Sequence, residues 1–300
     1  MSNLSAHCRD LIDQELSLFE AEYQQYYLAG ESKPQAIGRP YLLHHDTSKQ
    51  GVLLIHGLMA APEEVRELAE YIYSLGYTVY AVRMAGHGTS ADDLANRKAS
   101  EWIASVDRGH DILKACCEHI SIAGFSTGAS VALYQVIKKP NAFKTLTCIS
   151  APLKFKKLST HFAEPVNAWN EFSLTWDSSI LGKLINTRKL RKEFATNHAD
   201  NPHINYLRCP VHSIVEIKKM MREVCKAFQS ISIPALVIHG TDDPKVDVQS
   251  SREIFKRIQS EHKQYKEVDF HLHGIIRGDI AKEAFKEIHS FFNNYFFIQA

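Results

Sequence analysis

The sequence predicts an α/β protein with a mostly parallel sheet, helices on both faces of that sheet and an inserted, mainly helical cap. Short, continuous apolar runs alternate along the chain with longer stretches whose apolar residues recur at helical spacing. The alternation is interrupted once, by about eighty residues, and then resumes. A chain of 300 residues, 45% of them hydrophobic, is also large enough to bury the core that such a sheet needs.

The first predicted strand covers residues 51–56, GVLLIH, an unbroken apolar run typical of a strand buried on both faces of a parallel sheet. Pro62 then opens a stretch with acidic residues at its start and apolar residues at helical spacing up to Leu75, which predicts a helix. The same reasoning gives the later elements in chain order. Further strands are expected at residues 77–82, 119–125, 145–150, 233–239 and 265–272, and further helices at residues 99–117, 127–138, 249–260 and 280–292.

This order of elements divides the chain into three kinds of segment. Residues 41–151 and 229–300 carry the alternation and are predicted to form the core. Residues 152–228 interrupt it and are too many for a bare loop, so they are interpreted as a cap with helices of its own. Residues 1–40 form an N-terminal extension, and its helix-like stretch at residues 11–27 has no predicted place in the fold.

Composition and charge argue against several classes of protein. The formal net charge of +1, from 35 basic and 34 acidic residues, provides no overall field to attract nucleic acid, so no nucleic-acid partner is expected. No run approaches the roughly 20 apolar residues that cross a bilayer, and residues 1–20 lack the segments of a signal peptide, so we expect a cytoplasmic protein. The six cysteines show neither CxxC nor metal-like spacing and are interpreted as buried free thiols, so no metal is expected.

Residues 124–128, GFSTG, match the G-x-S-x-G pattern and lie between a predicted strand and a predicted helix. In that context the serine occupies a tight, strained turn that projects its hydroxyl above the sheet edge. Side chains two residues away on either side would collide, which explains the glycines. Ser126 is therefore the candidate nucleophile, and the alternative interpretation is a chance string in a loop rich in small residues.

A serine hydroxyl needs a histidine to accept its proton and an acid to orient that histidine. Residues 240–246, GTDDPKV, follow a predicted strand and offer Asp242 and Asp243 at the edge where open α/β sheets bind ligands. His271 and His273 stand at the end of the last predicted strand and reach the same edge. The residues by themselves leave open which aspartate and which histidine act.

The loop that follows the first predicted strand, residues 56–60 (HGLMA), is expected to complete an oxyanion hole. Gly57 lets the backbone bend toward the serine, so that the amides of Leu58 and Thr127 together bind the oxyanion. Each such donor stabilises the transition state by on the order of 3 kcal/mol. His56 is interpreted as a brace for this loop rather than as a base.

In chain order, the motifs HGLMA, MAGHGTS at residues 84–90, GFSTG, GTDDPKV and HLHG resemble the α/β-hydrolase superfamily. The set is most similar to its bacterial carboxylesterase and monoacylglycerol-lipase-like branch. The resemblance covers about residues 50–292, and the predicted cap contributes nothing specific to it. It implies an α/β-hydrolase fold and a catalytic triad that works without a cofactor.

The resemblance also implies a choice between the candidate acids and bases. The family's G-x-x-D-x-x-V frame selects Asp243 and leaves Asp242 as a turn residue. The apolar segment and acid that usually follow the family histidine select His273 and leave His271 in the strand. This chain departs from the family by lacking the small pair that often precedes the histidine, and His87 is implied to be structural.

The resulting hypothesis is a serine hydrolase that cleaves a short or medium acyl ester, or a monoacylglycerol-like lipid ester, through an acyl-enzyme on Ser126. A thioesterase or an acyltransferase would use the same triad, and a non-catalytic ligand receptor could use the same fold. A haloalkane dehalogenase is disfavoured because that chemistry needs a carboxylate nucleophile at the elbow.

The predicted cap bears on the substrate and on possible partners. Its basic residues outnumber its acidic ones, which indicates either a solvated helical face or transient attraction to an anionic substrate or a lipid surface. Its aromatic residues indicate either an apolar lining above Ser126 or a small core of the cap itself. The sequence does not indicate an oligomeric state.

Overall fold

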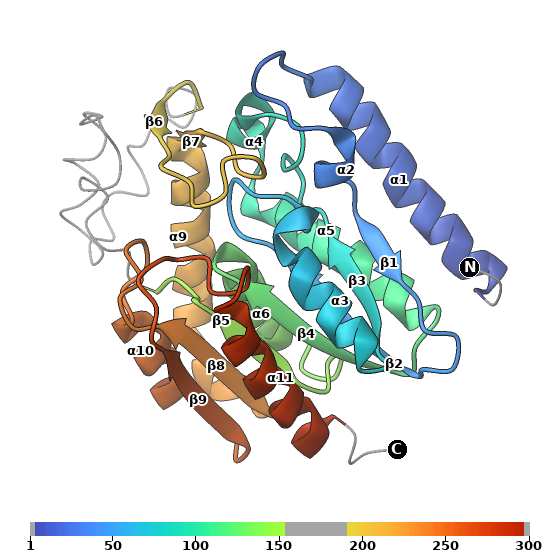
Figure 1. Ribbon diagram of the computed structural model, residues 1–300, viewed down its shortest axis with the longest axis vertical. Helices are drawn as coiled ribbons and strands as arrows, with labels where there is room; N and C mark the ends of the chain where they lie inside the picture. Colours follow the sequence, from blue (N-terminus) through green and yellow to red (C-terminus); the bar gives the residue numbers. More distant parts are fainter. Residues whose placement is uncertain (1–3, 154–190, 297–300) are drawn as a thin grey trace.

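The computed structural model describes residues 4–153 and 191–296. Within these ranges the main sheet has seven strands in the order β1-β3-β2-β4-β5-β8-β9 (Figure 1). Neighbouring strands run parallel except β1, which pairs with β3 in the antiparallel sense. The strands are β1 (Tyr41–Leu43), β2 (Gln50–Ile55), β3 (Thr78–Val82), β4 (His119–Phe125), β5 (Leu146–Ile149), β8 (Ala235–Gly240) and β9 (Lys263–Val268). The predicted α/β class with a mostly parallel sheet is confirmed.

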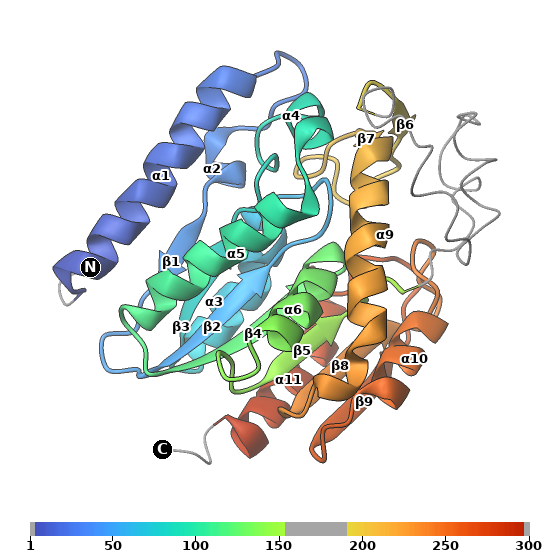
Figure 2. The same ribbon diagram turned by 180° about the vertical axis from the view of Figure 1, so that it is seen from behind.

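Helices cover both faces of this sheet, which is why its central strands are unbroken apolar runs. Val52 and Leu54 of β2 belong to the core on the side of α3 (Arg66–Ser74) and α11 (Ala281–Tyr295), which lie in front of the sheet in Figure 1. Leu53 and Ile55 belong to the core on the other side, which Figure 2 shows. The helices of that second side are α5 (Ala99–Lys114), α6 (Thr127–Lys138), α9 (Val211–Lys226) and α10 (Gln249–Arg257).

One predicted strand and three additional elements differ from the expectations. The last strand ends at Val268, so His271 lies in an exposed loop and the prediction that it belongs to the strand is wrong. Beyond the last strand pair, the amides of Thr241 and Asp242 still donate to the carbonyls of Val268 and Phe270. The half-buried edge strand β1, the 3-10 turn Pro62–Val65 before α3, and α4 (Ala91–Asn96) are additional elements.

The interrupted region holds a short antiparallel pair, β6 (Phe194–Thr196) and β7 (Arg208–Pro210), followed by α9. Helix α9 packs along α6 in the layer of helices that covers the sheet (Figure 2). Residues 154–190, with most of the basic and aromatic residues that the sequence analysis assigns to the cap, lie outside the described residues. The cap and its boundaries at residues 152 and 228 therefore stay a prediction.

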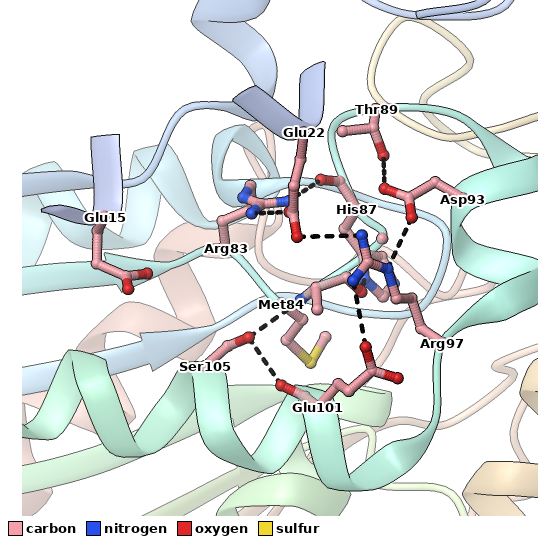
Figure 3. A network of polar contacts seen from close by, with 12 residues as sticks. Glu15, Glu22, Arg83, Met84, His87, Thr89, Asp93, Arg97, Glu101 and Ser105 are labelled. Carbon is pink, nitrogen blue, oxygen red and sulfur yellow. Dashed lines mark hydrogen bonds and ion pairs between the residues drawn. The ribbon is translucent and has the colours of Figure 1, made fainter. Parts of the chain in front are cut away.

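The N-terminal extension has a defined place in the structure. Helix α1 (Ala6–Tyr26) lies along α5, with Ser5 capping its first turn, and the short helix α2 (Gln35–Gly38) follows. Glu22 of α1 pairs with Arg83, which directly follows β3, and at 3.0 Å with Arg97, which directly follows α4 (Figure 3). Arg97 also pairs with Asp93 at 2.7 Å. This polar network ties the extension to the core.

Because Arg83 has 3% of its side chain exposed, removal of its partner would leave a buried charge uncompensated. We expect Glu22→Ala to lower the free energy of unfolding by roughly 3 kcal/mol. Glu20→Ala in the same helix is the matched control, because Glu20 and Arg39 form a pair with 46% and 44% of their side chains exposed. That change should cost less than about 1 kcal/mol. Equal effects in urea denaturation would contradict the structural role of Glu22.

Candidate active site

Ser126 stands between the end of β4 and the start of α6, with backbone angles φ 53° and ψ −121°. This is the left-handed region, which a residue with a Cβ rarely adopts. The turn is tight enough to exclude side chains on both flanks: a Cβ on Gly124 would lie 2.3 Å from the carbonyl carbon of Gly128, and a Cβ on Gly128 would lie 2.2 Å from the carbonyl oxygen of Ile55. The strained turn predicted for GFSTG is thus present in the structure.

The structure brings Ser126, His273 and Asp243 together in one chain of hydrogen bonds. His273 Nε2 lies 2.9 Å from Ser126 Oγ, and His273 Nδ1 lies 2.6 Å from Asp243 Oδ2. Asp243 is fully buried, whereas Asp242 is exposed on the neighbouring turn. Of the two aspartates and two histidines that the residues alone leave open, Asp243 and His273 contact the serine network, and Asp242 and His271 face solvent.

Asp243 is held as a carboxylate. Its Oδ1 accepts hydrogen bonds from the amides of Lys245 (2.8 Å) and Val246 (2.9 Å). Burial by itself would raise the pKa of Asp243, but His273, His239 and the backbone amides outweigh it and hold that pKa well below its usual range. The carboxylate is therefore ionised at neutral pH and can fix the proton on His273 Nδ1.

His239, at the end of β8, is a neighbour of the acid that the sequence analysis does not single out. Its Nε2 faces two acceptors, the carboxylate of Asp243 at 3.4 Å and the carbonyl of Val246 at 3.3 Å, so Nε2 carries the proton. Its Nδ1 then accepts the hydroxyl proton of Ser251 at 2.6 Å. His239 thus stabilises the loop that carries Asp243.

His56 braces the loop that carries Leu58. Its Nε2 accepts a hydrogen bond from the amide of Met84 at 3.3 Å, so the proton is on Nδ1, which donates to the carbonyl of Gly57 at 2.8 Å. The Gly57 carbonyl and the Leu58 N–H belong to one trans peptide unit, in which they point in opposite directions. The bond from His56 to this carbonyl therefore directs the Leu58 N–H away from His56. Leu58 and Thr127, the first residue of α6, both line the same cavity as Ser126.

The two neutral histidines beneath this loop predict sensitivity to acid. Burial lowers the pKa of His56 to about 4, and burial together with His56 lowers that of His87 well below its usual value. An unfolded chain protonates both near pH 6.5 and so binds more protons than the folded chain below that pH. The free energy of unfolding should therefore fall as the pH drops from about 6.5 to 4, by on the order of 3 kcal/mol from His56 alone.

Urea denaturation at several pH values in this window tests the expectation. His87→Asn cannot titrate and should flatten the pH dependence, whereas His271→Asn, at an exposed position, should leave it unchanged. A wild-type free energy of unfolding that stays constant over the window would contradict the assignment of neutral histidines.

A cavity of about 100 Å³ lies at Ser126. Its lining combines apolar and polar side chains, and most of the polar ones belong to the segment that precedes β7. The apolar lining residues are Leu58, Met59, Phe125, Cys209, Ile214, Ile217 and Val246, and the polar ones beyond Ser126, Thr127 and His273 are Glu64, Asn197, His198, Asp200, Asn201, Asn205 and Lys245.

Residues 197–206, here called the strap, contact the loops that carry His273, Asp243 and Met59. Asp200 accepts a hydrogen bond from the amide of Gly274 at 3.2 Å and pairs with Lys245 at 3.6 Å, so it links the loops that carry His273 and Asp243. The amide of Tyr206 donates to the carbonyl of Met59 at 2.8 Å in the loop that follows β2. No local pattern marks the strap, which explains why the sequence analysis does not select it.

The sequence pattern of the family described as "Serine aminopeptidase, S33" matches residues 46–279, more than half of the chain. The chain belongs to this S33 family. The predicted membership of the α/β-hydrolase superfamily, on the side of its carboxylesterases and monoacylglycerol lipases, is confirmed.

Two curated relatives of this S33 protein carry names of ester-cleaving enzymes. It is 28% identical over 214 residues to the thermostable monoacylglycerol lipase of Bacillus sp. (strain H-257), covering 71% of this chain and 78% of the relative. It is 22% identical over 218 residues to a carboxylesterase of Bacillus subtilis (strain 168), covering 72% of this chain and 81% of the relative.

Solved structures agree with the S33 fold. A structure described under LipS and LipT, two metagenome-derived lipolytic enzymes, superposes with a TM-score of 0.71 at 21% identity. The match covers 90% of this chain and 100% of the chain in that structure. The monoacylglycerol lipase of Paleococcus ferrophilus gives a TM-score of 0.66 at 19% identity, and the match covers 84% of this chain and 97% of the lipase chain. Both support the fold assignment.

No group of three His, Cys, Asp or Glu side chains in the described part of this S33 chain is placed to hold a metal ion. No described helix is long and apolar enough to cross a membrane.

Proposed function

We propose that the protein hydrolyses carboxylic esters through an acyl-enzyme on Ser126. The observation that carries the proposal is the chain of bonds from Ser126 to His273 (2.9 Å) and from His273 to Asp243 (2.6 Å). The relatives named as a monoacylglycerol lipase and a carboxylesterase support the same reaction class.

In the proposed mechanism, His273 Nε2 takes the proton of Ser126 as its oxygen attacks the ester carbonyl. Asp243 stabilises the imidazolium that forms, and the amides of Leu58 and Thr127 bind the oxyanion. His273 then protonates the departing alcohol. A water molecule, deprotonated by His273 in the second half-reaction, releases the acid and restores the serine.

We expect the acyl group to pack against the apolar lining residues of the cavity and the alcohol to meet the polar residues of the segment that precedes β7. A short or medium acyl ester, or a monoacylglycerol-like lipid ester, fits this mixed lining, because its chain is apolar and its alcohol can form hydrogen bonds. A cytoplasmic location and a transient lipid-surface contact through the basic cap stay predictions from the sequence.

A fluorophosphonate probe and a series of p-nitrophenyl esters, from acetyl to palmitoyl, test the proposal. The wild type should be labelled at Ser126 and should hydrolyse part of the series, and Ser126→Ala should do neither. Faster turnover of acyl-CoA than of every ester would favour the thioesterase alternative. A folded wild type that neither reacts with the probe nor hydrolyses any of these substrates would support the non-catalytic receptor instead.

A further inference from the structure

Glu64 is a buried carboxyl that lies against the oxyanion loop. It belongs to the 3-10 turn Pro62–Val65, has 6% of its surface exposed, and lines the same cavity as Ser126. Its Oε2 accepts a hydrogen bond from the amide of Gly57 at 2.7 Å. The triad does not account for a carboxyl in this place, and no motif of the sequence analysis includes it.

Together with His56, Glu64 fixes both peptide units of Gly57. Glu64 holds the N–H of the unit that precedes the glycine, and His56 holds the carbonyl of the unit that follows it, at 2.7 Å and 2.8 Å respectively. A glycine has the freest backbone of any residue, so these two bonds supply the restraint that a side chain would otherwise give. The second peptide unit carries the amide of Leu58.

The space around Gly57 shows how closely this loop is confined. A Cβ at Gly57 would lie 3.1 Å from Glu64 Oε2 and 3.4 Å from Ser126 Cβ, so the chain passes between the carboxyl and the nucleophile. A small rotation of the Gly57 backbone would therefore move the Leu58 amide relative to the serine oxygen. An oxyanion donor is effective only when it is directed at the place where charge develops.

The surroundings of Glu64 also make glutamine a suitable substitute. Burial raises the pKa of Glu64, although the Gly57 amide, His273, Lys245 and Asn205 oppose this rise. The buried site therefore favours the neutral form of the Glu64 carboxyl more than bulk water does. A glutamine carbonyl would still accept the Gly57 N–H, whereas an alanine would leave that buried amide without a partner.

We propose that Glu64 is a positioning residue, which fixes Gly57 so that the Leu58 amide meets the oxyanion in the transition state. This inference rests on the proposed function. Its distinguishing consequence is a loss of kcat with little change in KM, because the interaction that Glu64 supports is made only in the transition state.

The test compares ester hydrolysis by Glu64→Gln, Glu64→Ala and Glu64→Met, the last filling the space without providing a comparable acceptor. Glu64→Ala and Glu64→Met should lose about 10- to 100-fold in kcat with KM within about threefold, and Glu64→Gln should stay within about threefold of wild type. If Glu64→Ala does not fold, Glu64→Met carries the comparison.

Glu216 provides the matched control, because it is also a buried glutamate (7% exposed) whose carboxylate accepts a backbone N–H, that of Ala99 at 3.2 Å, away from the cavity. Glu216→Ala should lower stability and leave kcat within about twofold of wild type. The proposal is overturned if Glu64→Ala and Glu64→Met behave like this control, if they change only KM, or if Glu64→Gln loses as much kcat as they do.

Hydrogen exchange of the segment that contains Gly57 and Leu58 separates this inference from the proposed function. Faster exchange there in Glu64→Ala and Glu64→Met, but not in Glu64→Gln, is expected whether or not any ester is hydrolysed. Unchanged exchange in all three variants would overturn the positioning role. Failure of the wild type to hydrolyse esters, with the expected exchange pattern, would instead refute the proposed function alone.

Discussion

Replacing Ser126 with alanine is expected to lower kcat for ester hydrolysis by roughly 10⁴- to 10⁶-fold, to the residual rate that binding and the oxyanion amides provide. The hydroxyl lies 2.9 Å from His273 Nε2 at the strained turn, and among the described residues it is the serine hydroxyl that contacts this nitrogen. The measurement is steady-state turnover of the p-nitrophenyl ester that the wild type cleaves fastest.

Ser130 gives the control for this experiment. It lies one helical turn further along α6, fully buried, and its hydroxyl has no hydrogen-bond partner among the described residues. Ser130→Ala should therefore leave both stability and turnover close to wild type. A Ser126→Ala variant that retains more than about one hundredth of wild-type turnover would rule out Ser126 as the nucleophile.

Asp243→Asn is expected to lower kcat by roughly 10⁴-fold. Asparagine would turn an N–H toward His273 Nδ1, so this nitrogen would lose its proton and Nε2 would gain one. When a neutral imidazole carries its proton on Nε2, that nitrogen cannot accept the proton of Ser126. Since Lys245 and Val246 donate their amides to Oδ1, the carbonyl of the asparagine is expected to take that position.

Asp242→Asn tests the same turn without touching the network. Asp242 is exposed, so this variant should stay within about threefold of wild type. Circular dichroism of both variants checks that the fold is kept. Equal losses of kcat in Asp242→Asn and Asp243→Asn would mean that the turn as a whole, rather than the Asp243 carboxylate, supports His273.

Several features could be predicted from sequence because they follow from constraints between near neighbours in the chain. Gly124 and Gly128 flank Ser126 because a Cβ at either place would collide with backbone, and that restriction is visible in five consecutive letters. The strands β2 and β4 read as apolar runs because helices cover both of their faces. The alternation of strands and helices, the G-x-S-x-G turn and the HGLMA loop are all local patterns of this kind.

The tertiary structure decided which groups meet at that elbow. His273 reaches Ser126 across 147 positions of sequence and reaches Asp243 across 30, and only the fold shows that Asp242 and His271 stay in solvent. The roles of Glu64, Asp200 and His239 depend on contacts between loops from different strands. No spacing of residues in the sequence predicts such contacts. The sequence alone thus determined the fold class and the strained serine, since steric rules act between adjacent residues. Family resemblance selected Asp243 and His273, and tertiary structure showed their contacts and alone revealed Glu64, Asp200 and His239, because burial and hydrogen bonding join residues that are distant along the chain.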